Sequence, residues 1–212
     1  MSATNWLLIV RFIEHNKRIE NLIRLYESHP DSKAKGRKDT DSTDILRAAV
    51  VLLHATFEDM CRIVERHMTP YATKEAVNEI PLKGTGDKGH ASKFFLGELL
   101  PFRGRTVDDV IQDSQREYLS RTTYNSVDDL CCLLTKYGLK KKYFDPYLAN
   151  IAAITKRRHH IVHQADRNEA KGKGQHQFQS IGKSTVRRWA RTMESIYTAF
   201  QAATAERVKN PE

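Results

Sequence analysis

The chain lacks the long apolar stretch that a membrane-spanning helix requires. Such a helix needs about 20 consecutive apolar residues, whereas the longest apolar run, residues 48–53, is much shorter. The short apolar stretch near the first residue has no basic segment ahead of it and is interrupted by Arg11, so a signal peptide is not expected. These absences predict a cytoplasmic protein without a membrane partner.

Cysteine is also scarce. The chain has three cysteines, Cys61, Cys131 and Cys132, and an odd number does not make the disulfide framework of a small secreted domain. We expect these thiols to behave as small buried apolar residues.

Acidic residues are outnumbered by basic ones. The chain has 26 Asp and Glu against 35 Lys and Arg, a net charge of +9. Such a surplus favours a polyanionic partner, with nucleic acid favoured over a membrane surface. The alternative is that these basic residues are simply solvated side chains on the surface. The basic residues gather in four clusters, at residues 33–38, 136–142, 167–173 and 183–191.

No segment alternates polar and apolar residues as a strand would, and helical spacing prevails. We therefore expect an all-α fold, a bundle of four to five main helices plus short ones, in a single domain comprising residues 1–212. Residues 1–30 are expected to form an N-terminal helix packed on the bundle, and residues 31–43 a linker. The expected helices are residues 3–28, a helix starting after residues 41–43 and ending at 68, and residues 107–120, 126–137, 145–167 and 184–208.

The second expected helix is apolar on nearly all sides between residues 45 and 57, which predicts that it is the most buried. Arg47, His54 and Glu58 interrupt this pattern at spacings of seven and four and therefore share one stripe. Such a stripe meets polar partners inside the fold, lines a cleft, or faces a second subunit.

Residues 158–163, Arg-His-His-Ile-Val-His, contain the leading candidate site. Arg158 occupies a position on the apolar line of its expected helix, beside Ile151 and Val162. A guanidinium placed there needs an anionic partner or ligand, and Glu58 is one candidate counter-ion. His163 lies about 140° further round the helix and close to His159.

An arginine and a histidine at one cleft suit metal-independent RNA cleavage. A histidine can take the proton of the attacking 2′-hydroxyl or give one to the leaving 5′-oxygen, while a guanidinium stabilises the charge on the phosphate. We assign acid or base chemistry to His163 and phosphate binding to Arg158. One residue of each kind is a sparse apparatus, so a homodimer that brings two of each together is part of the prediction.

Supporting roles are expected for several neighbours. His159, Glu58, His54 and Asp166 are candidates to line the site, and Asp166 either pairs with Arg167 or a neighbouring lysine or orients His163. His159 and His163 could also hold a metal if one of the other three supplied a further ligand, but we expect no metal and no other cofactor. Arg157 is predicted to lie on the surface and contact RNA backbone, as are Arg167, Lys171 and Lys173.

Arg158-x4-His163, followed by Gln-Ala-Asp-Arg, resembles the Arg-x4-6-His signature of HEPN-domain proteins. Residues 46–59 are similar to the early core helix of that family, and residues 125–130 resemble the segment that leads to the motif helix in its RNase and stress-defence branch. The resemblance covers residues 41–208. Two positions differ: His159 stands where many members have Asn or Asp, and Ala165 where members silenced by a nucleotidyltransferase often have Tyr.

The resemblance implies an antiparallel helical bundle that dimerises, with the arginine and histidine of both subunits lining the interface cleft. It also implies metal-independent endoribonuclease activity, as a toxin or in anti-phage or stress defence, with an antitoxin or nucleotidyltransferase as a further partner. Two alternatives stay open, because a fold alone does not establish catalysis. One is a non-catalytic nucleotide-binding, RNA-binding or dimerisation module, and the other is a structural protein in which Arg158 pairs internally with Glu58.

Overall fold

The computed structural model describes residues 3–30, 40–83, 96–167 and 178–210. Within these ranges the chain is helical apart from turns and loops, and the only β pairing is an isolated antiparallel bridge between Arg167 and Phe178. The prediction of an all-α fold is therefore confirmed. None of the described helices is long and apolar enough to cross a bilayer.

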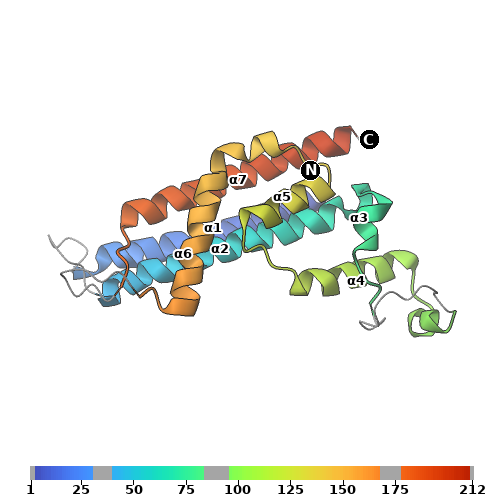
Figure 1. Cartoon of the computed structure of the whole chain (residues 1–212), viewed down its shortest axis with the longest axis horizontal. Helices are drawn as coiled ribbons and strands as arrows, with labels where there is room; N and C mark the ends of the chain where they lie inside the picture. The colour runs from blue at the N-terminus through green and yellow to red at the C-terminus, as the bar shows by residue number, and fades with distance from the viewer. Residues whose placement is uncertain (1–2, 31–39, 84–95, 168–177, 211–212) are drawn as a thin grey trace.

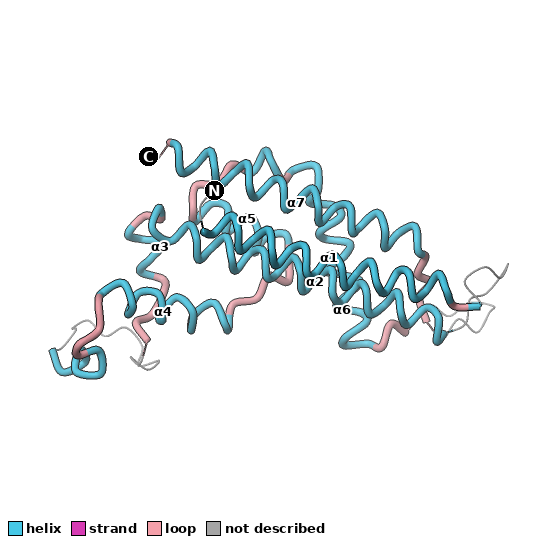
Figure 2. The backbone as a smooth tube through the Cα atoms, turned by 180° about the vertical axis from the view of Figure 1, so that it is seen from behind, coloured by secondary structure: helices cyan, strands magenta, loops and turns pink. Residues whose placement is uncertain are grey.

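Three long helices form the body of the molecule: α1 (Ala3–Ser28), α2 (Thr40–Met68) and α7 (Lys183–Lys209). They lie side by side, with α1 running opposite to α2 and α7 (Figure 1). Helix α6 (Leu148–Gln164) crosses them steeply, which is visible from both sides (Figures 1 and 2). The shorter elements are α3 (Lys74–Asn78), α4 (Val107–Arg121), α5 (Val127–Lys136) and the 3-10 turns Thr69–Tyr71, Leu96–Phe102, Lys141–Tyr143 and Asp145–Tyr147.

Local capping explains where the shorter helices begin and end. The Thr106 hydroxyl accepts a hydrogen bond from the Asp109 backbone N–H at 3.1 Å, and the Asp109 carboxylate accepts one from the Thr106 N–H at 3.2 Å, so a reciprocal capping box starts α4. Ser126 caps α5 by accepting from the Asp129 N–H at 3.0 Å. Gly138, at φ 65°, follows the end of α5 in the left-handed conformation that glycine adopts without strain.

Helix α2 is the centre of the core and buries more residues than any other described helix, as its composition predicts. It contacts α1, α4, α5, α6 and α7. Its apolar side chains, with those of α1 and α7, make one continuous cluster that includes Leu46, Leu53, Phe57, Ile23 and Phe200. The three thiols are free: Cys61 is buried as expected, whereas the expectation of burial is wrong for Cys132, which is exposed.

Two expected boundaries are wrong. Residues 40–43, assigned to a linker, belong to α2, while residues 31–39 lie outside the described ranges. The helix expected over residues 145–167 is preceded by a 3-10 turn and ends at Gln164, because Ala165 and Asp166 adopt left-handed φ angles of 48° and 55°. Both deviations at the end of α6 bear on the candidate site.

Candidate functional site

The last turns of α6 present the candidate residues. His159 and His163 are exposed, and their rings lie 4.6 Å apart, centroid to centroid, inclined by 43°. Val162, on the same turn, is 48% exposed. Arg158 is partly exposed and forms no hydrogen bond or ion pair with any residue of the described ranges. The helix thus carries a guanidinium and two imidazoles that are open to a ligand.

Helix α6 contacts α2, and the charge of Arg158 acts on His54, a member of the polar stripe of α2. His54 is 1% exposed, its Nδ1 is 3.7 Å from the Glu58 carboxylate, and its Nε2 is buried without a hydrogen-bond partner in the described ranges. Burial lowers the pKa of His54; Glu58 opposes this, and the charge of Arg158 lowers the pKa further. The imidazole of His54 therefore favours its neutral form.

Glu58 is not the counter-ion of Arg158. Its carboxylate accepts a hydrogen bond from the Tyr124 backbone N–H at 3.2 Å and lies 3.6 Å from the Arg62 guanidinium, one turn further along α2. No hydrogen bond or ion pair joins Glu58 to Arg158 in the described part of the chain, which removes the internal pair on which a purely structural role for Arg158 depends.

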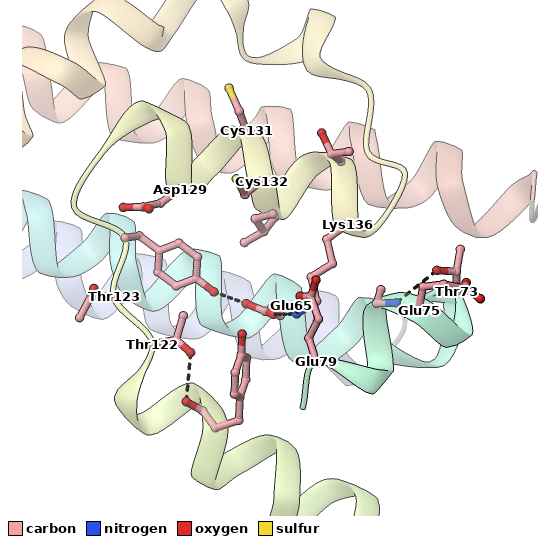
Figure 3. Close-up of a pocket in the computed structure, with 15 residues that line it drawn as sticks. Glu65, Thr73, Glu75, Glu79, Thr122, Thr123, Asp129, Cys131, Cys132 and Lys136 are labelled. Carbon is pink, nitrogen blue, oxygen red and sulfur yellow. Dashed lines mark hydrogen bonds and ion pairs between the residues drawn. The ribbon is translucent and has the colours of Figure 1, made fainter. Parts of the chain in front are cut away.

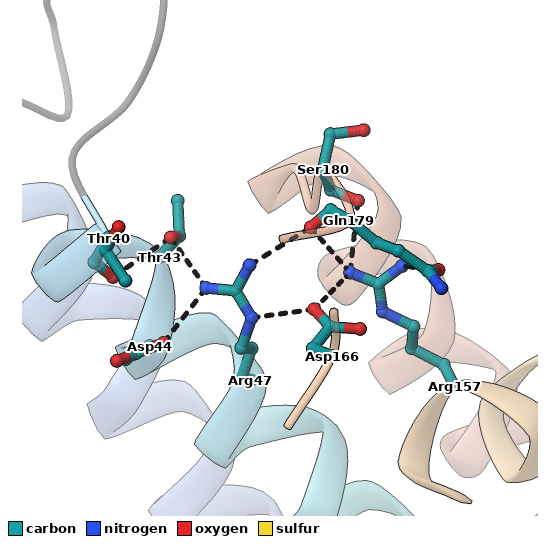
Figure 4. Close-up of polar contacts among 8 residues, drawn as sticks. All are labelled: Thr40, Thr43, Asp44, Arg47, Arg157, Asp166, Gln179 and Ser180. Carbon is teal, nitrogen blue, oxygen red and sulfur yellow. Dashed lines mark hydrogen bonds and ion pairs between the residues drawn. The ribbon is translucent and has the colours of Figure 1, made fainter. Parts of the chain in front are cut away.

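Asp166 is completely buried and holds two arginines (Figure 4). Its Oδ2 accepts one hydrogen bond from Arg47 Nε and one from Arg157 Nη2, each at 2.7 Å. Within the described residues Asp166 bonds neither Arg167 nor His163, and the neighbouring lysines, Lys171 and Lys173, lie outside the described ranges. The prediction that Arg157 lies on the surface is wrong: its side chain is 14% exposed, because it turns inward to Asp166 and Gln179.

The remaining basic candidates divide in two groups. Arg167 is exposed, just after the end of α6 and opposite Phe178 in the isolated bridge. Lys171 and Lys173 lie outside the described residues. Within the described ranges no group of three or more histidine, cysteine or acidic side chains could hold a metal, and Asp166, one possible third ligand for His159 and His163, is occupied by the two arginines.

Sequence reasoning missed a second polar centre around Glu65. This residue of α2 is 3% exposed, and its carboxylate accepts hydrogen bonds from the hydroxyls of Tyr124 and Tyr137 and from the Lys136 ammonium, the last at 3.2 Å. Figure 3 shows Lys136 reaching from α5 to Glu65 and Glu79 in the wall of a pocket of about 670 Å³. The signal was present, because Glu65 follows Glu58 by seven residues and so continues the stripe of Arg47, His54 and Glu58.

No family model, curated protein or solved structure matches the chain.

Proposed function

We propose that the chain is a metal-independent endoribonuclease of the HEPN type whose active site combines Arg158 and His163 from two copies. The observation that carries the proposal is the state of these side chains on α6: His163 is exposed, and Arg158 has no anionic partner in the described part of the chain. A cation on a packed helix without a counter-ion is poised to take an anionic ligand.

The reaction needs one proton removed and one supplied. One imidazole takes the proton of the 2′-hydroxyl as its oxygen attacks phosphorus, and the P–O5′ bond breaks as a second, protonated imidazole gives its proton to O5′. Arg158 donates hydrogen bonds to the non-bridging oxygens, where negative charge builds up. The products are a 2′,3′-cyclic phosphate and a 5′-hydroxyl.

Two copies supply what one helix does not. Arg158 and His163 project about 140° apart around α6, so a single chain does not turn both fully to one phosphate. A two-fold axis beside α6 brings His163 of one copy toward Arg158 of the other and provides both imidazoles. The exposed Val162, between these residues in sequence, offers apolar contact to the second copy.

The charge of the chain supports RNA as the substrate. The net charge of +9 attracts a polyanion, and Arg167 stands exposed four residues after His163, beyond the end of α6. A contact of this residue with the RNA backbone would add affinity and salt dependence without choosing a sequence. We place this activity in cytoplasmic defence or toxicity, restrained by an antitoxin; Ala165 argues against restraint by a nucleotidyltransferase, because members silenced in that way often have Tyr at this position.

Cleavage of a structured RNA in excess EDTA by the purified protein is the decisive test. The wild type should release fragments with cyclic-phosphate ends, and His163→Ala should lower the rate about 10²–10⁴-fold. Arg158→Ala should lower it about 10²–10³-fold. His67→Ala changes a half-buried histidine in the last turn of α2; it is the matched control and should cut like the wild type.

The same samples separate the alternatives. A non-catalytic module would bind RNA and leave it intact, with His163→Ala binding as the wild type does. Sedimentation equilibrium should give twice the chain mass, and expression in cells should arrest growth for the wild type and not for His163→Ala. Intact RNA with the wild-type dimer, or equal cutting by His163→Ala, would refute the proposal.

A further inference from the structure

We infer that Arg47, Asp166 and Arg157 form a positioning device that fixes the orientation of His163 at the end of α6. The inference rests on the proposed function in naming the reaction it serves. The device touches the candidate segment on both sides, since Arg157 immediately precedes Arg158 and Asp166 follows His163 by three residues. The hydrogen bond from Arg157 to the Asp166 carboxylate therefore connects the two ends of the segment that contains Arg158 and His163.

The backbone at the end of α6 is held in a costly conformation. Ala165 and Asp166 adopt left-handed φ angles of 48° and 55°, which are strained for a residue with a Cβ. The N–H groups of both residues donate to the His160 carbonyl, at 3.0 Å for Asp166. Strain of this kind persists only where the surroundings determine the conformation completely.

Those surroundings come from three segments (Figure 4). Arg47 of α2 donates to the Thr43 hydroxyl at 2.7 Å and to the Gln179 carbonyl at 3.0 Å, besides Asp166. Arg157 of α6 donates to the side-chain oxygen of Gln179 at 2.8 Å and to its carbonyl at 3.0 Å. The Gln179 N–H donates to the Asp166 carbonyl at 2.9 Å. The end of α6 is thereby fixed to α2 and to the segment before α7.

His163 depends on this support because its own ring makes no hydrogen bond within the described part of the chain. Its position follows from the last turn of α6 and from the ring of His159 beside it. A rotation of that turn would move the imidazole relative to Arg158, because the neighbouring Arg157 holds the start of the segment in place. A misplacement of about 1 Å at a reacting group costs about 10²-fold in rate.

Substitution of the arginine by lysine tests the device while keeping its charge. Arg157→Lys retains a cation for Asp166 but cannot reproduce the planar fork that binds Asp166 and Gln179 together. We expect kcat, per folded molecule, to fall about 10- to 100-fold, with KM for RNA changed less than about two-fold. Asp166→Asn should act in the same direction, and Arg157→Lys serves alone if that variant does not fold.

Arg207→Lys is the matched control. Arg207, in the last turn of α7, is another half-buried arginine that connects separate segments, because it donates to the carbonyls of Tyr137 and Tyr71 at 3.3 and 3.2 Å. Its substitution should lower thermal stability comparably and leave kcat unchanged. Equal kcat losses in both lysine variants would reduce the triplet to a general stabiliser and overturn the inference.

Two further outcomes are decisive. A rise in KM with kcat unchanged in Arg157→Lys would mean that Arg157 binds RNA and would overturn the positioning role. Independently of activity, the imidazole nitrogen resonances of His159 and His163 should shift in Arg157→Lys and stay in place in Arg207→Lys. Unchanged resonances in Arg157→Lys would overturn the inference. If the resonances shift in Arg157→Lys but the wild-type protein does not cut RNA, the proposed function alone is refuted.

Discussion

The buried carboxylate of Glu65 should contribute far more to stability than a neighbouring carboxylate that binds the same ammonium. Lys136 Nζ lies 3.2 Å from Glu65 and 3.3 Å from Glu79, but the side chains of these two acids are 4% and 65% exposed. Glu65→Gln leaves the ammonium without its buried counter-charge, which costs about 3–5 kcal/mol. Glu79→Gln breaks an exposed pair and should cost less than about 1 kcal/mol.

The tyrosine hydroxyls give a second measure of the same centre. Tyr137 donates to Glu65 at 3.0 Å, and Tyr124 donates to its other oxygen. A hydrogen bond to a charged group contributes about 1.5–3 kcal/mol, so Tyr137→Phe should lose that amount. The double variant Tyr137→Phe/Glu65→Gln should lose less stability than the sum of the two single losses, because both substitutions remove the same charge-assisted hydrogen bond.

Urea unfolding followed by circular dichroism measures these differences. All variants should keep the wild-type dependence of unfolding free energy on urea, so that midpoints report stability directly. The reasoning fails if Glu65→Gln costs no more than Glu79→Gln, or if the Tyr137→Phe and Glu65→Gln losses are additive.

Three further predictions concern single sites. Burial lowers the pKa of His54, so the folded state resists a proton that the unfolded chain accepts below about pH 6.5. The free energy of unfolding should therefore fall as the pH drops from 7 to 5. His54→Asn should weaken this pH dependence of stability, and an unchanged dependence would contradict the prediction. Gly138→Ala should cost at least about 1–2 kcal/mol for its left-handed φ, with its new Cβ 2.9 Å from Arg207 Nε, whereas Gly97→Ala, which meets nothing within 4 Å, should be neutral in thermal unfolding. Thr106→Ala should cost about 1 kcal/mol through the lost cap, and Thr106→Ser should restore it; equal melting temperatures for the two would argue against the capping box.

Local sequence signals were sufficient for most of the helices. The helix over residues 3–28 ends before Pro30, and α5 (Val127–Lys136) lies within the predicted residues 126–137, between the Ser126 cap and Gly138. These boundaries depend on side chains within a few residues of the backbone they cap or interrupt. The burial of α2 was equally legible, because an apolar surface on all sides leaves no face for solvent.

The end of α6 was not predictable in the same way. Neither Ala165 nor Asp166 favours a left-handed turn as glycine does, and the arginine that holds Asp166 from α2 lies 119 residues away in sequence. The surface position predicted for Arg157 was wrong for the same reason. Helical periodicity gives the side of the helix on which a residue lies, but only the distant partner Asp166 explains why this cation turns inward. The separation of about 140° between Arg158 and His163 follows from helical periodicity alone, whereas the partners of Glu58 required the fold.

The polar stripe of α2 also restricts how the bundle can assemble. Arg47 meets the end of α6, Glu58 the segment before α5, and Glu65 the side chains of α5 and its flanks. A slide of α2 by one residue would turn this stripe by about 100° and strand its charges among aliphatic neighbours, at several kcal/mol each. The apolar part of α2 alone could pack in several registers of similar energy, so these few ionised groups select a single register.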